Sequence, residues 1–273
     1  MKKSTGEQPY APRLDITYPE KFDAHMTELP APDAAAPGFD ETYPFLDKSP
    51  SFRIKSALLY LGIFVLVFAV CPIRFGLKIE GRRMLKKNRA LLRNGAMTAS
   101  NHVLRWDFLM ILQAVRFRRL YFPAWSRNLS GPDRTLIRLA GGIPVPDSIH
   151  VIKYFNQAFD ELHAKKKWIH VFPESSSWDY YQPIRPFKKG MFSMAYKYNI
   201  PIIPMAFSYR ESRGLYKIFR KNYPLITLRM GEPILPDASL PRREATALLR
   251  TETHRKIVEL AGITHNPHPA EGD

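Results

Sequence analysis

The chain has 273 residues, 45% of them hydrophobic, with a formal net charge of +16 and a single cysteine. This length suits one sizeable α/β domain with appendages. The lone Cys71 excludes an intrachain disulfide and a cysteine-based metal cluster. The basic balance suits nucleic acid, an anionic membrane surface or a phosphate-bearing substrate, so hydropathy has to decide among these classes.

The first fifty residues are acidic and rich in proline. They hold nine Asp and Glu against five Lys and Arg, together with eight prolines. Such a segment cannot bury enough apolar surface to offset the entropy lost on ordering. We therefore expect residues 1–50 to be a mostly disordered tail. They are not a signal peptide, because no apolar core follows Met1-Lys2-Lys3.

An uncharged apolar run, SALLYLGIFVLVFAVCPI, occupies residues 56–73. Its length is near the lower limit for a helix that crosses a bilayer, and a run that is apolar on every face is unusual for a surface helix. We predict that residues 51–90 form a membrane-associating helix and a basic linker, with a buried core helix as the alternative.

Basic residues follow the run, namely Arg74, Lys78, Arg82, Arg83, Lys86, Lys87 and Arg89. Basic residues next to a membrane segment favour the cytoplasmic side. We therefore expect a membrane protein whose catalytic domain lies on the cytoplasmic face, whether the segment spans the bilayer or dips in and returns.

Beyond residue 90, short apolar strands alternate with amphipathic helices. The expected strands are Met97–Ser100, Leu120–Trp125, Ile143–Val145, Trp168–Phe172 and Ile202–Phe207, and the expected helices are 105–117, 132–140, 151–166, 188–198 and 241–261. This alternation indicates an α/β domain, which we place at residues 91–264.

A His and an Asp lie where an expected strand meets an expected helix, in the stretch Ser100-Asn101-His102-Val103-Leu104-Arg105-Trp106-Asp107. Sites in open α/β sheets form at such junctions. From the first turn of the helix, Asp107 could hold one imidazole nitrogen of His102 and leave the other to take a proton. The pair alone is a weak signal, because strand-end histidines are often only structural.

Further segments follow in order: Phe172-Pro173-Glu174-Ser175, Phe187-Lys188-Lys189-Gly190 and Ile200-Pro201-Ile202-Ile203-Pro204. With the N-H-x-x-x-x-D motif of His102 and Asp107, they resemble the glycerolipid acyltransferase family, which includes the 1-acyl-glycerol-3-phosphate (lysophosphatidate) acyltransferases. The resemblance implies a mixed sheet flanked by helices. It also implies that His102 is the general base and that Asp107 orients it.

The resemblance further implies transfer of a fatty acyl group from acyl-CoA or acyl carrier protein to a lysophospholipid-type hydroxyl, with 1-acyl-glycerol-3-phosphate as the first candidate. No metal and no cofactor other than the acyl donor is implied. Glu174 is expected to contact the acceptor or to support its loop, and Asn101 to position the His102 loop. The expected substrate-binding residues are Asn101, Glu174, Ser175, Arg185, Lys188 and Gly190.

Two blocks depart from the family pattern. The second block reads Gly141-Gly142-Ile143-Pro144-Val145-Pro146-Asp147-Ser148, and the third continues Glu174-Ser175-Ser176-Ser177, so both lack the arginine that the family places there. Serine replaces neither the charge nor the planar fork of arginine. Nearby basic residues, Arg185 with Lys188 and Lys189 foremost, are the expected substitutes on an acceptor phosphate.

The departures leave other readings open. One is an acyltransferase of the same superfamily that uses a different lipid hydroxyl. Another is a non-catalytic membrane protein that binds lipid, although such a protein has little reason to keep both His102 and Asp107. The apolar run argues against a nucleic-acid-binding module. The expected partners are membrane lipids and the acyl donor, without nucleic acid or metal.

Overall fold

The computed structural model describes residues 10–26, 38–220 and 223–271. A mixed sheet has the order β1-β7-β6-β2-β5-β3-β4. The strands are β1 (Lys78–Glu80), β2 (Met97–Ser100), β3 (Leu120–Trp125), β4 (Gly142–Val145), β5 (Trp168–Val171), β6 (Ile202–Arg210) and β7 (Leu225–Met230). Because β6 and β7 pair antiparallel, β1 and β7 run opposite to the other strands.

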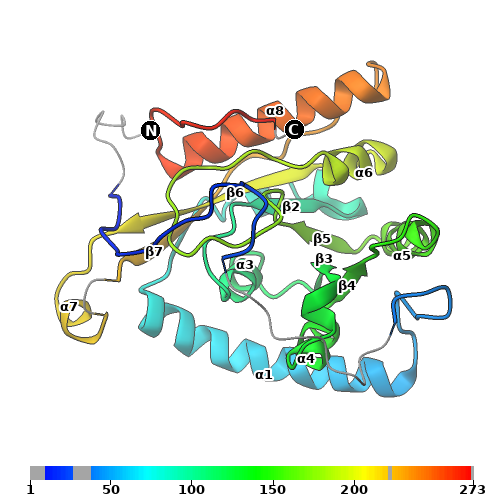
Figure 1. Cartoon of the computed structure of the whole chain (residues 1–273), viewed down its shortest axis with the longest axis horizontal. Coiled ribbons are helices and arrows are strands. Elements are labelled where there is room, and N and C mark those ends of the chain that lie inside the picture. The colour runs from blue at the N-terminus through cyan, green and yellow to red at the C-terminus, as the bar shows by residue number, and fades with distance from the viewer. Residues whose placement is uncertain (1–9, 27–37, 221–222, 272–273) are drawn as a thin grey trace.

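The helices lie on both faces of this sheet (Figure 1). They are α1 (Pro50–Phe75), α2 (Met84–Lys87), α3 (Asp107–Ala114), α4 (Arg134–Leu139), α5 (Ile152–Ala164), α6 (Gly190–Tyr198), α7 (Leu215–Arg220) and α8 (Arg242–Ala261), with 3-10 turns at Leu91–Asn94 and Ser126–Leu129. One apolar core joins α1 and α3 to the sheet, and a second joins α5, α6 and α8 to the other face.

The expected α/β architecture is confirmed, since each expected strand and helix coincides with an observed one to within a few residues. The edge strand β1 and its neighbour β7 were not expected. The register of β1 pairs Lys78 with Thr227 and Glu80 with Arg229. The domain therefore begins well before residue 91, because residues 78–80 belong to its sheet rather than to a linker.

Helix α1 contains the apolar run and packs along the domain. Among the described residues it is long and apolar enough to cross a membrane, with a mean hydropathy of 2.5 over its most apolar window. A narrow stripe of Ile63, Val67, Cys71 and Phe75 is buried in the core. The helix is thus neither fully buried nor detached, because one stripe packs on the domain while most of its surface is exposed.

The described parts of residues 1–50 form neither helix nor strand before α1. They nevertheless contact the domain, which differs from the expectation of a disordered tail. Phe45 is buried, and the Arg138 guanidinium donates to the Phe45 carbonyl at 3.1 Å. Residues 1–9 and 27–37 of the expected tail lie outside the described part of the chain.

Candidate active site

His102 and Asp107 meet at the carboxyl end of β2, where the chain turns into α3. The distance from His102 Nδ1 to Asp107 Oδ2 is 3.0 Å. The same carboxylate oxygen accepts hydrogen bonds from the backbone amides of Val103 at 2.6 Å and Leu104 at 3.0 Å. The carboxylate therefore organises the whole turn as well as the imidazole, because three donors converge on one oxygen.

The two partners differ in exposure. The Asp107 side chain is fully buried, whereas the His102 side chain is 22% exposed. Burial raises the pKa of the Asp107 carboxyl, and the hydrogen bonds from His102 and the two amides oppose that rise. No hydrogen bond to His102 Nε2 occurs among the described residues. Nδ1 of His102 is therefore held by the buried Asp107 carboxylate, while Nε2 has no hydrogen-bond partner in the described residues.

The His102 loop is fixed through its backbone by the segment after β5. The His102 amide donates to Glu174 Oε2 at 2.9 Å, and the His102 carbonyl accepts from the Trp178 amide at 3.1 Å. The His102 ring stacks on Phe172, with centroids 3.9 Å apart. Because amide, carbonyl and ring are all engaged, the imidazole has little freedom to turn away.

Glu174 and Arg185 form a buried ion pair behind this loop. Arg185 Nη2 donates to Glu174 Oε2 at 2.9 Å, and the Arg185 amide donates to Oε1 at 2.9 Å. The Arg185 and Glu174 side chains are 1% and 2% exposed. Burial raises the pKa of the Glu174 carboxyl, and the charge of Arg185 opposes that rise. Of the two roles expected for Glu174, the structure supports the loop role.

This burial argues against the expectation that Arg185 contacts an acceptor phosphate. Its Nη1 donates to Ser176 Oγ at 2.7 Å, and its guanidinium carbon lies 4.4 Å from the centroid of the Trp178 ring. A guanidinium enclosed by Glu174, Ser176 and Trp178 presents no open face to a ligand. The basic residue expected to bind phosphate instead supports the His102 loop from inside.

The other expected binding residues are less enclosed or serve the backbone. Asn101 is buried and exchanges two hydrogen bonds with the backbone of Phe207, at 2.8 and 3.1 Å, which ties β2 to β6. Ser175 is exposed, in a left-handed turn with φ 66°. Lys188 and Gly190 are exposed at the start of α6. Of the expected binding residues, only Glu174 forms a hydrogen bond with His102 within the described part of the chain.

A strap of N-terminal residues, 18–26, crosses this region and was not expected from the sequence (Figure 1). Four of its polar contacts with the domain are Tyr18 Oη to the Asp179 carbonyl (3.0 Å), Arg185 Nη1 to the Phe22 carbonyl (2.8 Å), Lys188 Nζ to Asp23 Oδ2 (3.2 Å) and Trp178 Nε1 to the Ala24 carbonyl (2.9 Å). No local pattern could have signalled these contacts, because the partners in these four are between 154 and 165 residues apart in the chain.

The end of the strap brings a second imidazole to the site. The His25 ring stacks on Trp125 with centroids 3.8 Å apart. Burial lowers the pKa of His25, and the nearby His102 lowers it further. The site therefore combines residues of the strap with residues from the ends of β2, β3 and β5.

His170 is buried on β5 and serves the core. Its Nδ1 lies 2.8 Å from Thr98 Oγ1, and burial lowers the pKa of His170 to about 3. The ring is therefore neutral at physiological pH. This position agrees with a structural histidine rather than a second base.

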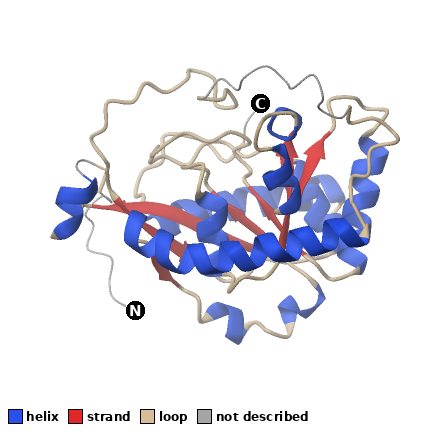
Figure 2. Cartoon of the chain, turned by 90° about the horizontal axis from the view of Figure 1, so that it is seen from below, coloured by secondary structure: helices blue, strands red, loops and turns tan. Residues whose placement is uncertain are grey.

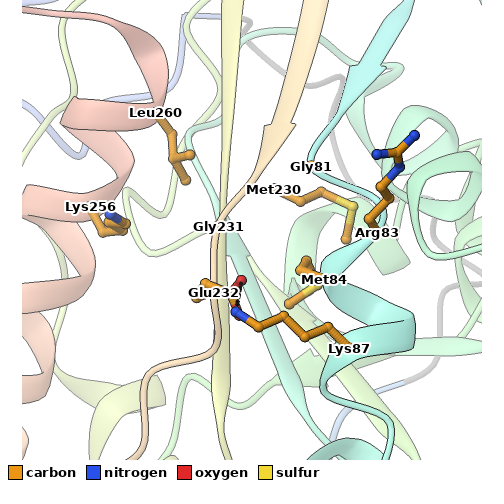
Figure 3. A pocket seen from close by; sticks show the side chains of 9 residues that line it. All are labelled: Gly81, Arg83, Met84, Lys87, Met230, Gly231, Glu232, Lys256 and Leu260. Atoms are coloured by element: carbon orange, nitrogen blue, oxygen red, sulfur yellow. Dashed lines mark hydrogen bonds and ion pairs between the residues drawn. The ribbon is translucent and has the colours of Figure 1, made fainter. Parts of the chain in front are cut away.

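A surface cavity of about 410 Å³ lies elsewhere, between the β7 end and helices α2 and α8 (Figure 3). Its lining includes Lys87 and Glu232, which form an ion pair at 2.9 Å. None of the expected site residues lines it. Within the described residues, no group of three or more His, Cys, Asp or Glu side chains could hold a metal ion.

Comparison with known proteins identifies the domain. Residues 76–208 match the protein-family model described as Acyltransferase. This part of the chain is an acyltransferase-family domain. The match confirms the resemblance to the glycerolipid acyltransferases, and its first residue agrees with the inclusion of β1 in the domain.

A solved structure is also similar to this chain. It is the 1-acyl-sn-glycerophosphate (LPA) acyltransferase PlsC from Thermotoga maritima, with 18% identity, a TM-score of 0.48, and coverage of 79% of this chain and 100% of that one. No curated protein sequence matches the chain significantly.

Proposed function

We propose that this acyltransferase moves a fatty acyl group from acyl-CoA or acyl carrier protein to the hydroxyl of a lysophospholipid-type acceptor, with His102 as general base. The observation that carries the proposal is the contact between His102 Nδ1 and the buried Asp107 carboxylate at 3.0 Å. This contact favours the imidazole tautomer in which Nδ1 carries the hydrogen and Nε2 has a free lone pair.

The proposed reaction uses that lone pair. His102 Nε2 takes the proton of the acceptor hydroxyl as its oxygen attacks the thioester carbonyl carbon. The C–S bond then breaks, and the imidazolium returns the proton to the departing thiolate. The ester and the free thiol are the products, so the step needs no covalent acyl-enzyme and no metal.

We propose 1-acyl-glycerol-3-phosphate as the first acceptor to test, on the sequence resemblance. The enclosure of Arg185 favours a second class, acceptors without a terminal phosphate, because the guanidinium expected to bind that phosphate is already paired with Glu174. Lys188 is the exposed alternative, but it pairs with Asp23 at 3.2 Å.

We also propose that the enzyme works on a membrane, with the catalytic domain on its cytoplasmic side. The exposed apolar surface of α1 supports contact with a membrane, since Leu58, Leu61 and Val65 are 63%, 62% and 65% exposed. Leaving such a surface in water is unfavourable by about 25 cal/mol per Å² of apolar area.

The test is an acyl-transfer assay with labelled acyl-CoA and acyl carrier protein against lysophosphatidate, zwitterionic lysophospholipids and monoacylglycerol. Wild-type enzyme should acylate one of these acceptors, and His102→Ala should lower kcat by about 100-fold or more, the usual contribution of a general base. Full activity of a folded His102→Ala enzyme would refute the mechanism. A chain that binds lysolipids without acylating any of them would support a non-catalytic lipid-binding role.

A further inference from the structure

Helix α7 is fixed against the carboxyl-terminal end of α1 (Figure 1). The Tyr216 hydroxyl donates to the Pro72 carbonyl at 2.7 Å, and the Arg220 guanidinium donates to the Arg74 carbonyl. Tyr216 and Arg220 are four residues apart and therefore lie on the same side of α7. That side of α7 therefore contacts α1.

The opposite side of α7 is apolar and uncovered. Leu215, Ile218 and Phe219 are 70%, 71% and 78% exposed, among the highest values for large apolar side chains in the described chain. Single exposed apolar residues are common, but three within one short helix form a patch. Such a patch on a soluble surface marks a contact with another apolar phase.

This patch continues the exposed surface of α1. Ile73, 72% exposed, follows Pro72, the residue whose carbonyl binds Tyr216. The exposed large apolar residues of α1 before it are Ile54, Leu58, Leu61, Phe64, Val65, Leu66 and Phe68. Viewed from the side of α1, as in Figure 2, the long helix lies across the domain and α7 extends beyond its end.

The attachment of α1 decides how this surface can meet a bilayer. Near its start, Ser56 Oγ donates to the Leu139 carbonyl at 2.5 Å and Tyr60 Oη to the Ala140 carbonyl at 2.7 Å. Near its end, Cys71 and Phe75 are buried in the core. Because the helix is held to the domain at both ends, its outer face can lie on a membrane while the domain remains in water.

Basic residues border this surface and identify the phase that it contacts. Arg53, Lys55, Arg74 and Lys217 are exposed on α1 and α7. Cationic side chains at the edge of an apolar helical face favour anionic headgroups above the acyl chains. A second protein chain would need no such border.

We propose that α7 is a second membrane contact, which inserts Leu215, Ile218 and Phe219 between the acyl chains of an anionic bilayer beside an α1 that lies along its surface. The proposal rests on the membrane location given under the proposed function. The α7 contact is a separate anchor from a segment far later in the chain. Because α7 is fixed to the end of α1, both can contact one membrane surface only if α1 lies along that surface and does not span the bilayer.

The test uses the full chain and vesicles of phosphatidylglycerol and phosphatidylcholine in about equal amounts. Three proteins are compared with wild type by co-sedimentation: Leu215→Ser/Ile218→Ser/Phe219→Ser, an α1 variant with Leu61→Asp/Val65→Asp, and Leu248→Ser as the matched control. Leu248 is 54% exposed on α8, across the sheet from α1. The α7 variant should bind vesicles at least about tenfold more weakly, and the control should bind as wild type.

A second readout locates α7 directly. A tryptophan introduced by Phe219→Trp should be quenched by brominated acyl chains beyond the quenching seen in wild type. Wild-type vesicle binding by the α7 variant would overturn the inference, and if the α1 variant had lost binding, the proposed membrane location would still stand. Wild-type binding by both variants would overturn both. An α7 variant that alters self-association but not vesicle binding would assign the patch to a second copy and would also overturn the inference.

Discussion

Glu174 holds His102 from behind, because its Oε2 accepts both the His102 backbone amide and Arg185 Nη2 at 2.9 Å. The His102 loop is thereby coupled to a buried ion pair rather than to solvent. Removing one partner of such a pair leaves an uncompensated charge, which costs about 3–5 kcal/mol.

Arg185→Met should therefore lower the free energy of unfolding by about 3–5 kcal/mol, measured by urea denaturation. The double variant Glu174→Leu/Arg185→Met should be more stable than Arg185→Met alone, because it leaves no unpaired charge. A phosphate contact by Arg185, as expected from the sequence, would instead make Arg185→Ala raise the acceptor KM. A stable Arg185 variant with a raised KM would restore that phosphate role.

Asp107→Asn should lower kcat by roughly 100-fold or more while keeping the turn. Because His102, Val103 and Leu104 share one carboxylate oxygen, the new amide oxygen can keep the turn only by taking that place, which removes the negative charge that stabilises the imidazolium. Circular dichroism and an unfolding curve provide the folding control. An Asp107→Asn enzyme with near wild-type kcat would show that the charge of Asp107 is not needed for the reaction.

Acid should destabilise the protein partly through His170. Its pKa is lowered from 6.5 to about 3, so the unfolded chain takes up a proton below pH 6.5 that the folded chain does not. This contribution to stability is complete above pH 6.5 and falls by about 1.4 kcal/mol per pH unit towards pH 3. Between pH 6 and 4, His170→Gln should reduce the dependence of the unfolding free energy on pH by up to about 1.4 kcal/mol per pH unit, which corresponds to one proton. An unchanged slope would mean that His170 titrates equally in both states.

Two glycines should respond in opposite ways to alanine. Gly81 has φ 79°, and a Cβ there would lie 2.1 Å from the Met230 carbonyl oxygen, so Gly81→Ala should cost about 2 kcal/mol or more. Gly190 begins α6 with no atom within 4 Å of an added Cβ. Gly190→Ala should be neutral or stabilise the protein by up to about 1 kcal/mol. Thermal unfolding measures both, and equal losses would contradict the difference in space.

The strap should shield Trp178. Its indole is 2% exposed and donates to the Ala24 carbonyl. A chain that starts at residue 27 should show greater acrylamide quenching of tryptophan fluorescence than the full chain. The difference should shrink when both chains carry Trp178→Phe, and the remainder should come from Trp125, on which His25 of the strap stacks. If truncation leaves quenching unchanged, the strap does not cover this ring in solution.

The sequence by itself determined the features that depend on neighbours in the chain. Alternation of apolar residues located β2, β3, β5 and the helices between them, because strand and helix periods are local properties. His102 and Asp107 could be paired in advance because a single turn joins them, so spacing alone brings them within reach.

Tertiary structure decided which distant segments meet. Arg185 looked like a phosphate ligand because its charge is visible in the sequence, whereas its pairing with buried Glu174 depends on the folding of the loop between them. The strap over Trp178 and the contact of Tyr216 with Pro72 join residues 154 and 144 positions apart, and no periodicity encodes them. The burial and the partners of a side chain depend on all the segments that pack around it. The same basic or apolar residue type can therefore be a ligand, part of the core or a membrane contact.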